Sequence, residues 1–309
     1  MNEAMISSLI LAAIRMAIPL LLITLAELYS ERAGMVNIGL EGLATMGALA
    51  GFMLTFLTGS TWLGILAGAI VGIIINMIYA YATISLCANH VVYGMAINIL
   101  APALASFIYR VYFGAGSSLK QIELMSAISI PVLKDIPIIG PALFNQTPMV
   151  YLTFALVIFT AIFFNKSKAG LNYRSVGEYP KAAATLGINV IGVKYLSCVI
   201  CGALAGIGGA YLTTCYSTTY TEGIVSGRGF IALAAVIFGR WTGGGALIAC
   251  LFFGFCDALQ IRLQVASVGV PYQFFQMIPY VATVVVLAIV GSKKAGPLAN
   301  GKPYRKEER

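Results

Sequence analysis

The stretch MISSLILAAIRMAIPLLLITLAELY, Met5–Tyr29, decides what kind of fold this chain can adopt. It is longer than the roughly 20 residues that an α-helix needs to cross a hydrocarbon core of about 30 Å. Its charged residues are Arg15 and Glu27 alone. A helix of this composition is poorly suited to a water-exposed surface, so the stretch indicates a membrane span.

The rest of the chain repeats this pattern. Of its 309 residues, 60% are hydrophobic and 10% are charged, whereas an average soluble domain has about 25% charged residues. Further apolar runs lie at about 35–57, 61–86, 91–113, 148–164, 193–216, 229–239, 243–264 and 270–291. The sequence therefore predicts an all-α polytopic membrane protein with about 8–10 transmembrane helices, some short or broken, in one domain over residues 1–309.

The positive charges indicate which loops face the cytosol. The formal net charge is +8, and eleven of the nineteen Lys and Arg residues lie in 166–194 and 293–309. These stretches flank apolar runs, as cytosolic loops do under the positive-inside rule. We therefore expect a cytosolic loop at about 165–192 and a cytosolic tail at about 292–309. The charge-balanced loop 114–147 belongs outside, and nucleic acid is not an expected partner.

Two regions suggest a pathway through the membrane. The run 229–239 covers only about half of the hydrocarbon core at 1.5 Å per residue, so it indicates a broken or re-entrant helix. Glycines cluster there and in the second run, at Gly34, Gly39, Gly42, Gly47, Gly223, Gly227, Gly229 and Gly239. Backbone that leaves the helix at membrane depth is tolerated where it is buried in protein or lines a cavity. The alternative is that these glycines let helices pack closely.

Isolated polar residues within the apolar runs are candidates for lining that pathway. A carboxylate at the bilayer centre costs roughly 2.5 to 3.5 kcal/mol, so such residues usually face a cavity or a partner. Glu41 lies four residues after Asn37 and shares its helical face. The translocation candidates are Asn37, Glu41, Asn98, Gln260 and Gln276, and the candidates for an outer gate are Glu222 and Arg228. For each, and at least equally for Asp257, the alternative is a structural hydrogen bond between helices.

Catalytic chemistry is not expected in this chain. It has one histidine, and no set of Cys and His residues has the spacing of a metal site. No Gly-x-x-x-x-Gly-Lys-Ser/Thr loop is present, so ATP is not hydrolysed here. We expect no catalytic residue, cofactor or metal.

Three stretches carry a family resemblance. They are ERAGMVNIGLEG at 31–42, GEYPKAAATLGI at 177–188, and TEGIVSGRGFIALAAVIFGRW at 221–241, which DALQ follows at 257–260. They resemble the permeases of nucleoside and simple-sugar ATP-binding-cassette (ABC) importers, a branch of the branched-chain amino acid and ribose permease superfamily. GRGF at 227–230 and GKPY at 301–304 look more like nucleoside permeases; a simple sugar or a branched-chain amino acid is the alternative solute.

The resemblance also implies a setting and partners. It implies a type II-like importer permease, multi-pass in the inner (cytoplasmic) membrane, with a second homologous permease, a cytosolic ABC ATPase and an extracytoplasmic solute-binding lipoprotein. This chain has NHVV at 89–92 where the family usually shows Asn-Gln-Val-Val, which puts any fixed role of the second position in doubt.

The cytosolic loop contains a candidate docking element for the ATPase. Residues 178–188 are polar and alanine-rich, with a proline at a first-turn position where its missing N–H does no harm. We expect a helix of about three turns, like the family's coupling helix, whose small residues let another surface approach. The residues are Glu178, Tyr179, Pro180, Ala183, Gly187 and Ile188.

Two other classes of protein are weighed against this one. A secondary transporter also has broken helices and a midplane site, but its inverted repeats are not found beyond a loose similarity of the glycine clusters. A membrane enzyme needs clustered acids or metal ligands, and the sequence shows none.

Overall fold

The structure is a computed structural model that describes residues 3–114, 120–129, 143–265, 272–290 and 296–304. Seven helices in these ranges are long and apolar enough to cross a membrane. They are α1 (Glu3–Arg32), α2 (Leu40–Thr58), α3 (Thr61–Ala80) with its π-helical extension (Tyr81–Ser85), α4 (His90–Phe113), α6 (Pro148–Lys166), α9 (Val190–Tyr211) with its extension (Leu212–Tyr216), and α11 (Gly243–Val265).

Shorter helices complete the architecture. The apolar ones are α10 (Arg228–Phe238), α12 (Tyr272–Gln276) and α13 (Ile278–Val290), and the loop after α6 forms α7 (Lys168–Glu178) and α8 (Pro180–Thr185). Each predicted apolar run contains a helix, so the all-α polytopic fold is confirmed. The short run 229–239 is a helix of 11 residues, as its length predicts.

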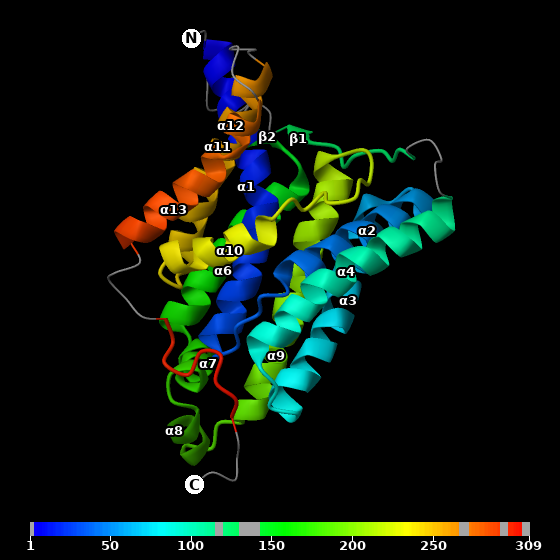
Figure 1. Cartoon of the computed structure of the whole chain (residues 1–309). Coiled ribbons are helices and arrows are strands. Elements are labelled where there is room, and N and C mark those ends of the chain that lie inside the picture. Colours follow the sequence, from blue (N-terminus) through cyan, green and yellow to red (C-terminus); the bar gives the residue numbers. More distant parts are fainter. Residues whose placement is uncertain (1–2, 115–119, 130–142, 266–271, 291–295, 305–309) are drawn as a thin grey trace.

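The two predicted sides of the protein separate in space. In Figure 1, α7, α8 and the C-terminal segment lie together at one end. The start of α1 lies at the other end, with the short antiparallel pair β1 (Ile128–Ser129) and β2 (Asn145–Gln146). The positive-inside rule predicts from the basic residues of the first end that this end faces the cytosol, and we refer to it as the cytosolic end.

The predicted helix 178–188 is wrong in its extent. Glu178 is the last residue of the preceding helix, α7, and the helix that follows, α8, has only 6 residues. The physical reason is the Tyr179–Pro180 pair. Proline disfavours helical backbone in the residue before it, and Tyr179 lies at φ −138° and ψ 79°. Proline occupies the first turn of α8 as predicted.

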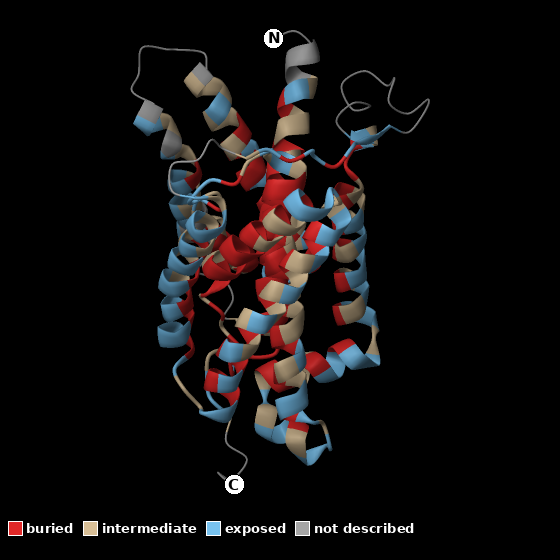
Figure 2. Ribbon diagram, turned by 90° about the vertical axis from the view of Figure 1, so that its right-hand side faces the viewer, coloured by how far each residue is buried: buried red, intermediate tan, exposed pale blue. Residues whose placement is uncertain are grey.

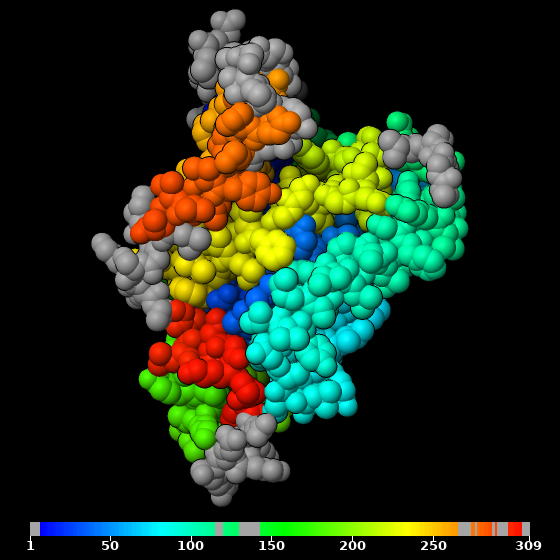
Figure 3. Space-filling view, viewed as in Figure 1, coloured from blue at the N-terminus to red at the C-terminus, as the bar shows by residue number. Residues whose placement is uncertain are grey.

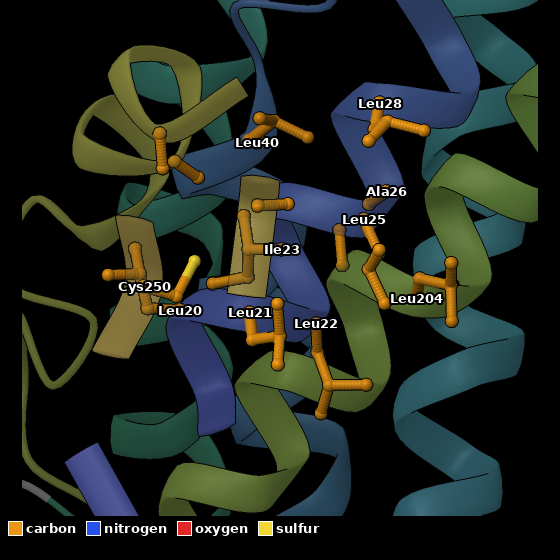
Figure 4. Close-up of a cluster of buried hydrophobic side chains, with 14 of the residues drawn as sticks. Leu20, Leu21, Leu22, Ile23, Leu25, Ala26, Leu28, Leu40, Leu204 and Cys250 are labelled. Atoms are coloured by element: carbon orange, nitrogen blue, oxygen red, sulfur yellow. The ribbon is translucent and has the colours of Figure 1, made fainter. Parts of the chain in front are cut away.

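Helix α1 forms the centre of the molecule. Most of its residues from Ala13 to Glu31 are buried, and Figure 2 shows buried residues concentrated along the middle of the protein. Figure 4 shows leucines of α1 and Ile23 in one cluster with side chains such as Leu40, Leu204 and Cys250. A helix that is apolar all round is stable when other helices surround it.

Helix α4 lies at the periphery. Its outward side chains include Val92, Ile99, Leu100 and Phe107, which are 62%, 73%, 66% and 64% exposed. Such a surface suits lipid or another membrane protein rather than water.

Several glycines pack helices together, as the alternative explanation of the clusters states. A Cβ on Gly47 of α2 would lie 2.3 Å from the carbonyl oxygen of Gly206 in α9, and a Cβ on Gly72 of α3 would lie 2.1 Å from that of Gly202. Small residues at these crossings let the backbones of α2, α3 and α9 approach closely.

Candidate functional site

The chain between α1 and α2 is not helical from Met35 to Asn37 and forms turns on either side. Asn37 connects this interruption to two helices. Its backbone N–H donates to Glu27 Oε1 of α1 (2.9 Å), and its Nδ2 donates to Asn76 Oδ1 of α3 (2.7 Å). Its own Oδ1 accepts the N–H of Gly39 (2.9 Å). The side chain is fully buried, so Asn37 holds the interruption in place.

Asn98 of α4 contacts the same interruption at the start of α2. Its Nδ2 donates to the carbonyl oxygen of Ile38 (2.7 Å), and its Oδ1 accepts the N–H of Gly42 (2.9 Å). The first N–H groups of a helix have no partner within that helix. One amide side chain therefore supplies both a donor and an acceptor where α2 begins.

Glu41 joins the start of α2 to the start of α10. Its Oε1 accepts the N–H of Gly227 (2.8 Å), and its Oε2 accepts the N–H of Gly229 (2.7 Å). A carboxylate is favourable here because the N-terminal end of a helix carries partial positive charge and unpaired N–H groups. Gly227 has φ +78°, and a Cβ on Gly229 would lie 2.4 Å from the nitrogen of Glu41. The contact thus requires glycine at both positions.

The other end of α10 is attached to the end of α1. After α10 the chain turns through Arg240 and Trp241, which both have positive φ. The indole N–H of Trp241 donates to Glu31 Oε2, and the guanidinium of Arg32 donates to the carbonyl oxygen of Trp241. Both ends of α10 are therefore bonded to residues that flank the α1–α2 interruption.

Sequence reasoning did not select Glu31 or Trp241 as site residues. The sequence offered one signal for Glu31, its position at the end of a long apolar run, which indicates a buried carboxylate. In the structure Glu31 is buried, with 5% of its surface exposed.

The two residues proposed for an outer gate lie in different contacts. Glu222 accepts from Arg110 Nε (3.1 Å) and Nη2 (2.9 Å), and both side chains are exposed. Arg228 instead lies beside Asp257 of α11, with Nη2 and Oδ2 4.0 Å apart. That Glu222 and Arg228 form an outer gate stays a prediction.

Arg228 and Asp257 line a cavity of about 370 Å³ between α1, α10, α11 and α13. Gln260, a predicted pathway residue, lines it too. Gln276, another predicted pathway residue, ends α12, and its side chain lies outside the described part of the structure.

The predicted ATPase-docking residues differ in their availability. Ala183 is 2% exposed and packs in a small cluster with Val176 and Val190. Helix α8 turns this side toward the rest of the protein, and contact of Ala183 with a partner stays a prediction. Tyr179 and Leu186 are 62% and 81% exposed.

The remaining docking candidates, Gly187, Pro180 and Ile188, lie at the two ends of α8. Gly187 is exposed with φ +81°, so it ends α8 in a conformation that favours glycine. Pro180 and Ile188 are half-buried.

The C-terminal segment 296–304 lies against the end of α7. The N–H of Ala299 donates to the carbonyl oxygen of Gly177 (2.9 Å), and the N–H of Leu298 donates to Glu178 Oε2 (3.2 Å). Figure 1 shows this segment beside α7. The predicted docking residue Glu178 thus also holds the tail.

The same segment contacts the α1–α2 interruption. The N–H of Gly301 donates to the carbonyl oxygen of Gly34 (3.1 Å), and Asn300 Nδ2 donates to Glu31 Oε2 (3.1 Å). The tail therefore bonds the end of α7 and the end of α1 at once.

We predict that Glu41→Gln destabilises the protein. Glutamine offers one acceptor oxygen in place of two and loses the charge, so one N–H at the start of α10 loses its partner. A hydrogen bond to a charged group contributes about 1.5–3 kcal/mol, so the thermal unfolding midpoint in detergent should fall by about 5 °C. Glu222→Gln removes an exposed ion pair and is the control, with an expected change of about 1 °C or less. Equal midpoints for Glu41→Gln and the wild type would contradict the importance of this contact.

Comparisons with known proteins agree with this architecture. Residues 9–289 match the family model described as "Branched-chain amino acid transport system / permease component". The nucleoside ABC transporter permease protein NupC of Lactococcus lactis is 37% identical over 302 residues, which cover 94% of each chain. The guanosine ABC transporter permease protein NupQ of Bacillus subtilis is 37% identical over 315 residues, which cover 98% of each chain.

A third relative differs in its named solute. TsgC13 of Haloferax volcanii, an ABC transporter permease whose name provisionally assigns it to glucose, is 36% identical over 85% of this chain and 80% of its own. No solved structure matches the chain. The match over most of the sequence shows that this chain belongs to the branched-chain amino acid transport system permease family and is a transmembrane permease subunit of an ABC transporter.

Proposed function

We propose that this chain is the pathway-forming permease of a nucleoside importer in the cytoplasmic membrane. The observation that carries the proposal is the Glu41 carboxylate, which joins two helix interruptions by accepting the N–H groups of Gly227 and Gly229. Interrupted helices at membrane depth occur where backbone is buried in protein or lines a cavity, and transporters place their solute sites at such interruptions.

The surface around this contact supports the proposal. In Figure 3 the molecule is hollowed between α10 and α4, and atoms of the α1–α2 region lie at the bottom of the hollow. Glu41 at the start of α2 and Asn98 of α4 are partly exposed, whereas Asn37 is buried. We infer that Glu41 and Asn98 border the solute path. Asn37 acts on the path through the backbone that it holds.

The choice of a nucleoside rests on the relatives. Two that are named for nucleosides or guanosine align over 94% and 98% of this chain. The second candidate solute is a simple sugar, which the relative assigned to glucose favours. A nucleoside and a sugar both carry a ring with several hydroxyl groups, so they share part of their recognition chemistry.

We predict that the chain supports nucleoside uptake. Proteoliposomes that contain the permease with its partner subunits and binding lipoprotein should accumulate labelled guanosine in an ATP-dependent manner. Excess unlabelled nucleoside should compete, whereas excess glucose should not. Competition by glucose but not by nucleosides would assign the chain to the sugar carriers and contradict the proposal.

Transport needs an ATPase, and the predicted cytosolic loop at about 165–192, which we call the coupling loop, offers a place for it. Tyr179 and Leu186 are exposed apolar side chains on either side of α8 at the cytosolic end. Apolar and aromatic residues that stand out from a polar surface commonly anchor a partner. We infer that these two residues are the main contacts of α8 with the ATPase.

The C-terminal segment provides a route from this docking surface into the membrane. It bonds the end of α7 on one side and Glu31 on the other, and Glu31 in turn binds Trp241 at the end of α10. An ATPase can bias the permease if contacts along such a route differ in free energy between two states. We infer that the tail carries movement of the coupling loop to α10.

We predict that docking and coupling can be separated by two variants. Leu186→Glu places a charge on the docking surface and should abolish co-purification of the ATPase. Asn300→Ala removes the hydrogen bond from the tail to Glu31. It should leave co-purification unchanged but reduce uptake per ATP hydrolysed about tenfold, since a lost hydrogen bond to a charged group contributes about 1.5–3 kcal/mol.

Matched controls exist for both variants. Leu171→Glu alters an exposed leucine of α7 in the same loop, and Lys302→Ala alters an exposed side chain of the same tail. Both controls should behave as the wild type. Wild-type co-purification for Leu186→Glu would place the docking surface elsewhere, and wild-type coupling for Asn300→Ala would remove the tail from the route.

A further inference from the structure

The cavity between α1, α10, α11 and α13 combines polar and apolar walls. Arg228, Asp257 and Gln260 provide a cation, a carboxylate and an amide, whereas Met16, Ile261 and Tyr280 provide apolar surface. Its volume of about 370 Å³ lies within the range of small-molecule sites. A flat, apolar base linked to a hydroxylated ring needs this combination of surfaces.

The ion pair in the cavity is loose. Arg228 Nη2 and Asp257 Oδ2 are 4.0 Å apart, although these side chains are only 14% and 19% exposed. The exposed pair Arg110–Glu222 shows a closer arrangement, with two contacts of 2.9 and 3.1 Å to one carboxylate oxygen. Charges at membrane depth are costly unless they are well paired. The Arg228–Asp257 pair can therefore gain stabilisation from hydrogen bonds to a further polar group.

The other hydrogen bonds of Arg228 leave part of its guanidinium unused. Nη1 donates to the carbonyl oxygens of Ile224 (3.3 Å) and Val225 (3.1 Å). Within the described ranges, the buried Nε has no hydrogen-bond partner. The backbone contacts hold the side chain in position, because they fix the guanidinium to the turn that precedes α10. The cation is therefore positioned before any ligand arrives.

We propose that this cavity is a solute site that binds the ribose ring of a nucleoside, with the Asp257 carboxylate accepting hydrogen bonds from the ribose hydroxyls. Carboxylates bind ribose hydroxyls in this way in dinucleotide-binding proteins. Bonds to a charged acceptor are also stronger than neutral ones. Tyr280, Met16 and Ile261 contact the base. This site rests on the proposed nucleoside transport and specifies which part of the solute is recognised.

The site also changes the interpretation of three residues. From the sequence, Asp257 was explained at least equally well by a structural hydrogen bond between helices. Arg228 was a candidate for the outer gate, and Gln260 was a candidate for the translocation pathway. The cavity brings all three to one place on α10 and α11. An isolated structural pair would not require the adjacent amide and open volume.

The test compares guanosine with 3′-deoxyguanosine in the complete transporter. For the wild type, uptake of guanosine should have the lower KM. Asp257→Asn should raise the KM for guanosine about tenfold and leave the KM for the deoxy analogue within about twofold. The preference for the 3′-hydroxyl should then be lost. The wild type and the Asp257→Asn variant are assayed with the same binding lipoprotein. Its contribution therefore cancels when the KM ratio of the two nucleosides in the variant is divided by that ratio in the wild type.

A second variant guards against misfolding of the first. Gln260→Met keeps the Arg228–Asp257 pair and the side-chain length, and it should reduce the same preference by a smaller factor. Uptake of the deoxy analogue measures the amount of working transporter for each variant. Glu123→Gln, at an exposed residue outside the cavity, is the control and should keep the wild-type preference.

The possible results separate the site from the function. Wild-type guanosine uptake with an unchanged 3′-hydroxyl preference in both cavity variants would overturn the site and leave the proposed function standing. Absence of guanosine uptake by the wild type would overturn the proposed function and the site with it.

Discussion

The carboxylate of Glu41 is the contact on which the arrangement of the interrupted helices depends. It accepts the N–H groups of Gly227 and Gly229 and so fixes the start of α10 against the start of α2. These N–H groups would otherwise lack partners away from water, which is costly. The glycines admit the close approach, and Asn98 completes the hydrogen bonding of the α1–α2 interruption from the opposite side. The non-helical backbone is thus held by specific side chains.

Helix α10 connects three parts of the proposed mechanism, although it has only 11 residues. Its first residue, Arg228, lines the cavity that we assign to the solute. The turn after it binds Glu31 and Arg32 through Trp241. Glu31 also binds Asn300 of the C-terminal segment, which contacts the coupling loop. In the proposed function, a shift of the coupling loop therefore has a bonded path to this cavity, and binding of a solute there has the same path back, as linkage requires.

Local sequence predicts the helices well but not the pairs that join them. Hydropathy and run length identify the spans and the short α10, and the cost of burying a carboxylate singles out Glu41. Its partner is 186 residues away in the sequence, and only packing brings the two together. Asp257 and Arg228 are missed as a pair for the same reason. The division between α7 and α8 was readable from Tyr179–Pro180, because proline restricts the residue before it. The burial of Ala183 was not predicted, because an alanine-rich segment has no apolar periodicity that marks its buried side.

Amide hydrogen exchange at Gly227 and Gly229 tests the central claim most directly. The permease would be compared with its Glu41→Gln variant in lipid nanodiscs, and exchange would be followed in peptides that cover residues 226–231. If the Glu41 carboxylate holds the start of α10, these amides are protected in the wild type and exchange at least about tenfold faster in the variant, as expected for the loss of a hydrogen bond to a charged group. Peptides from α9 should exchange equally in both proteins. Equal exchange at residues 226–231 would contradict the account, because α10 would then be positioned without Glu41.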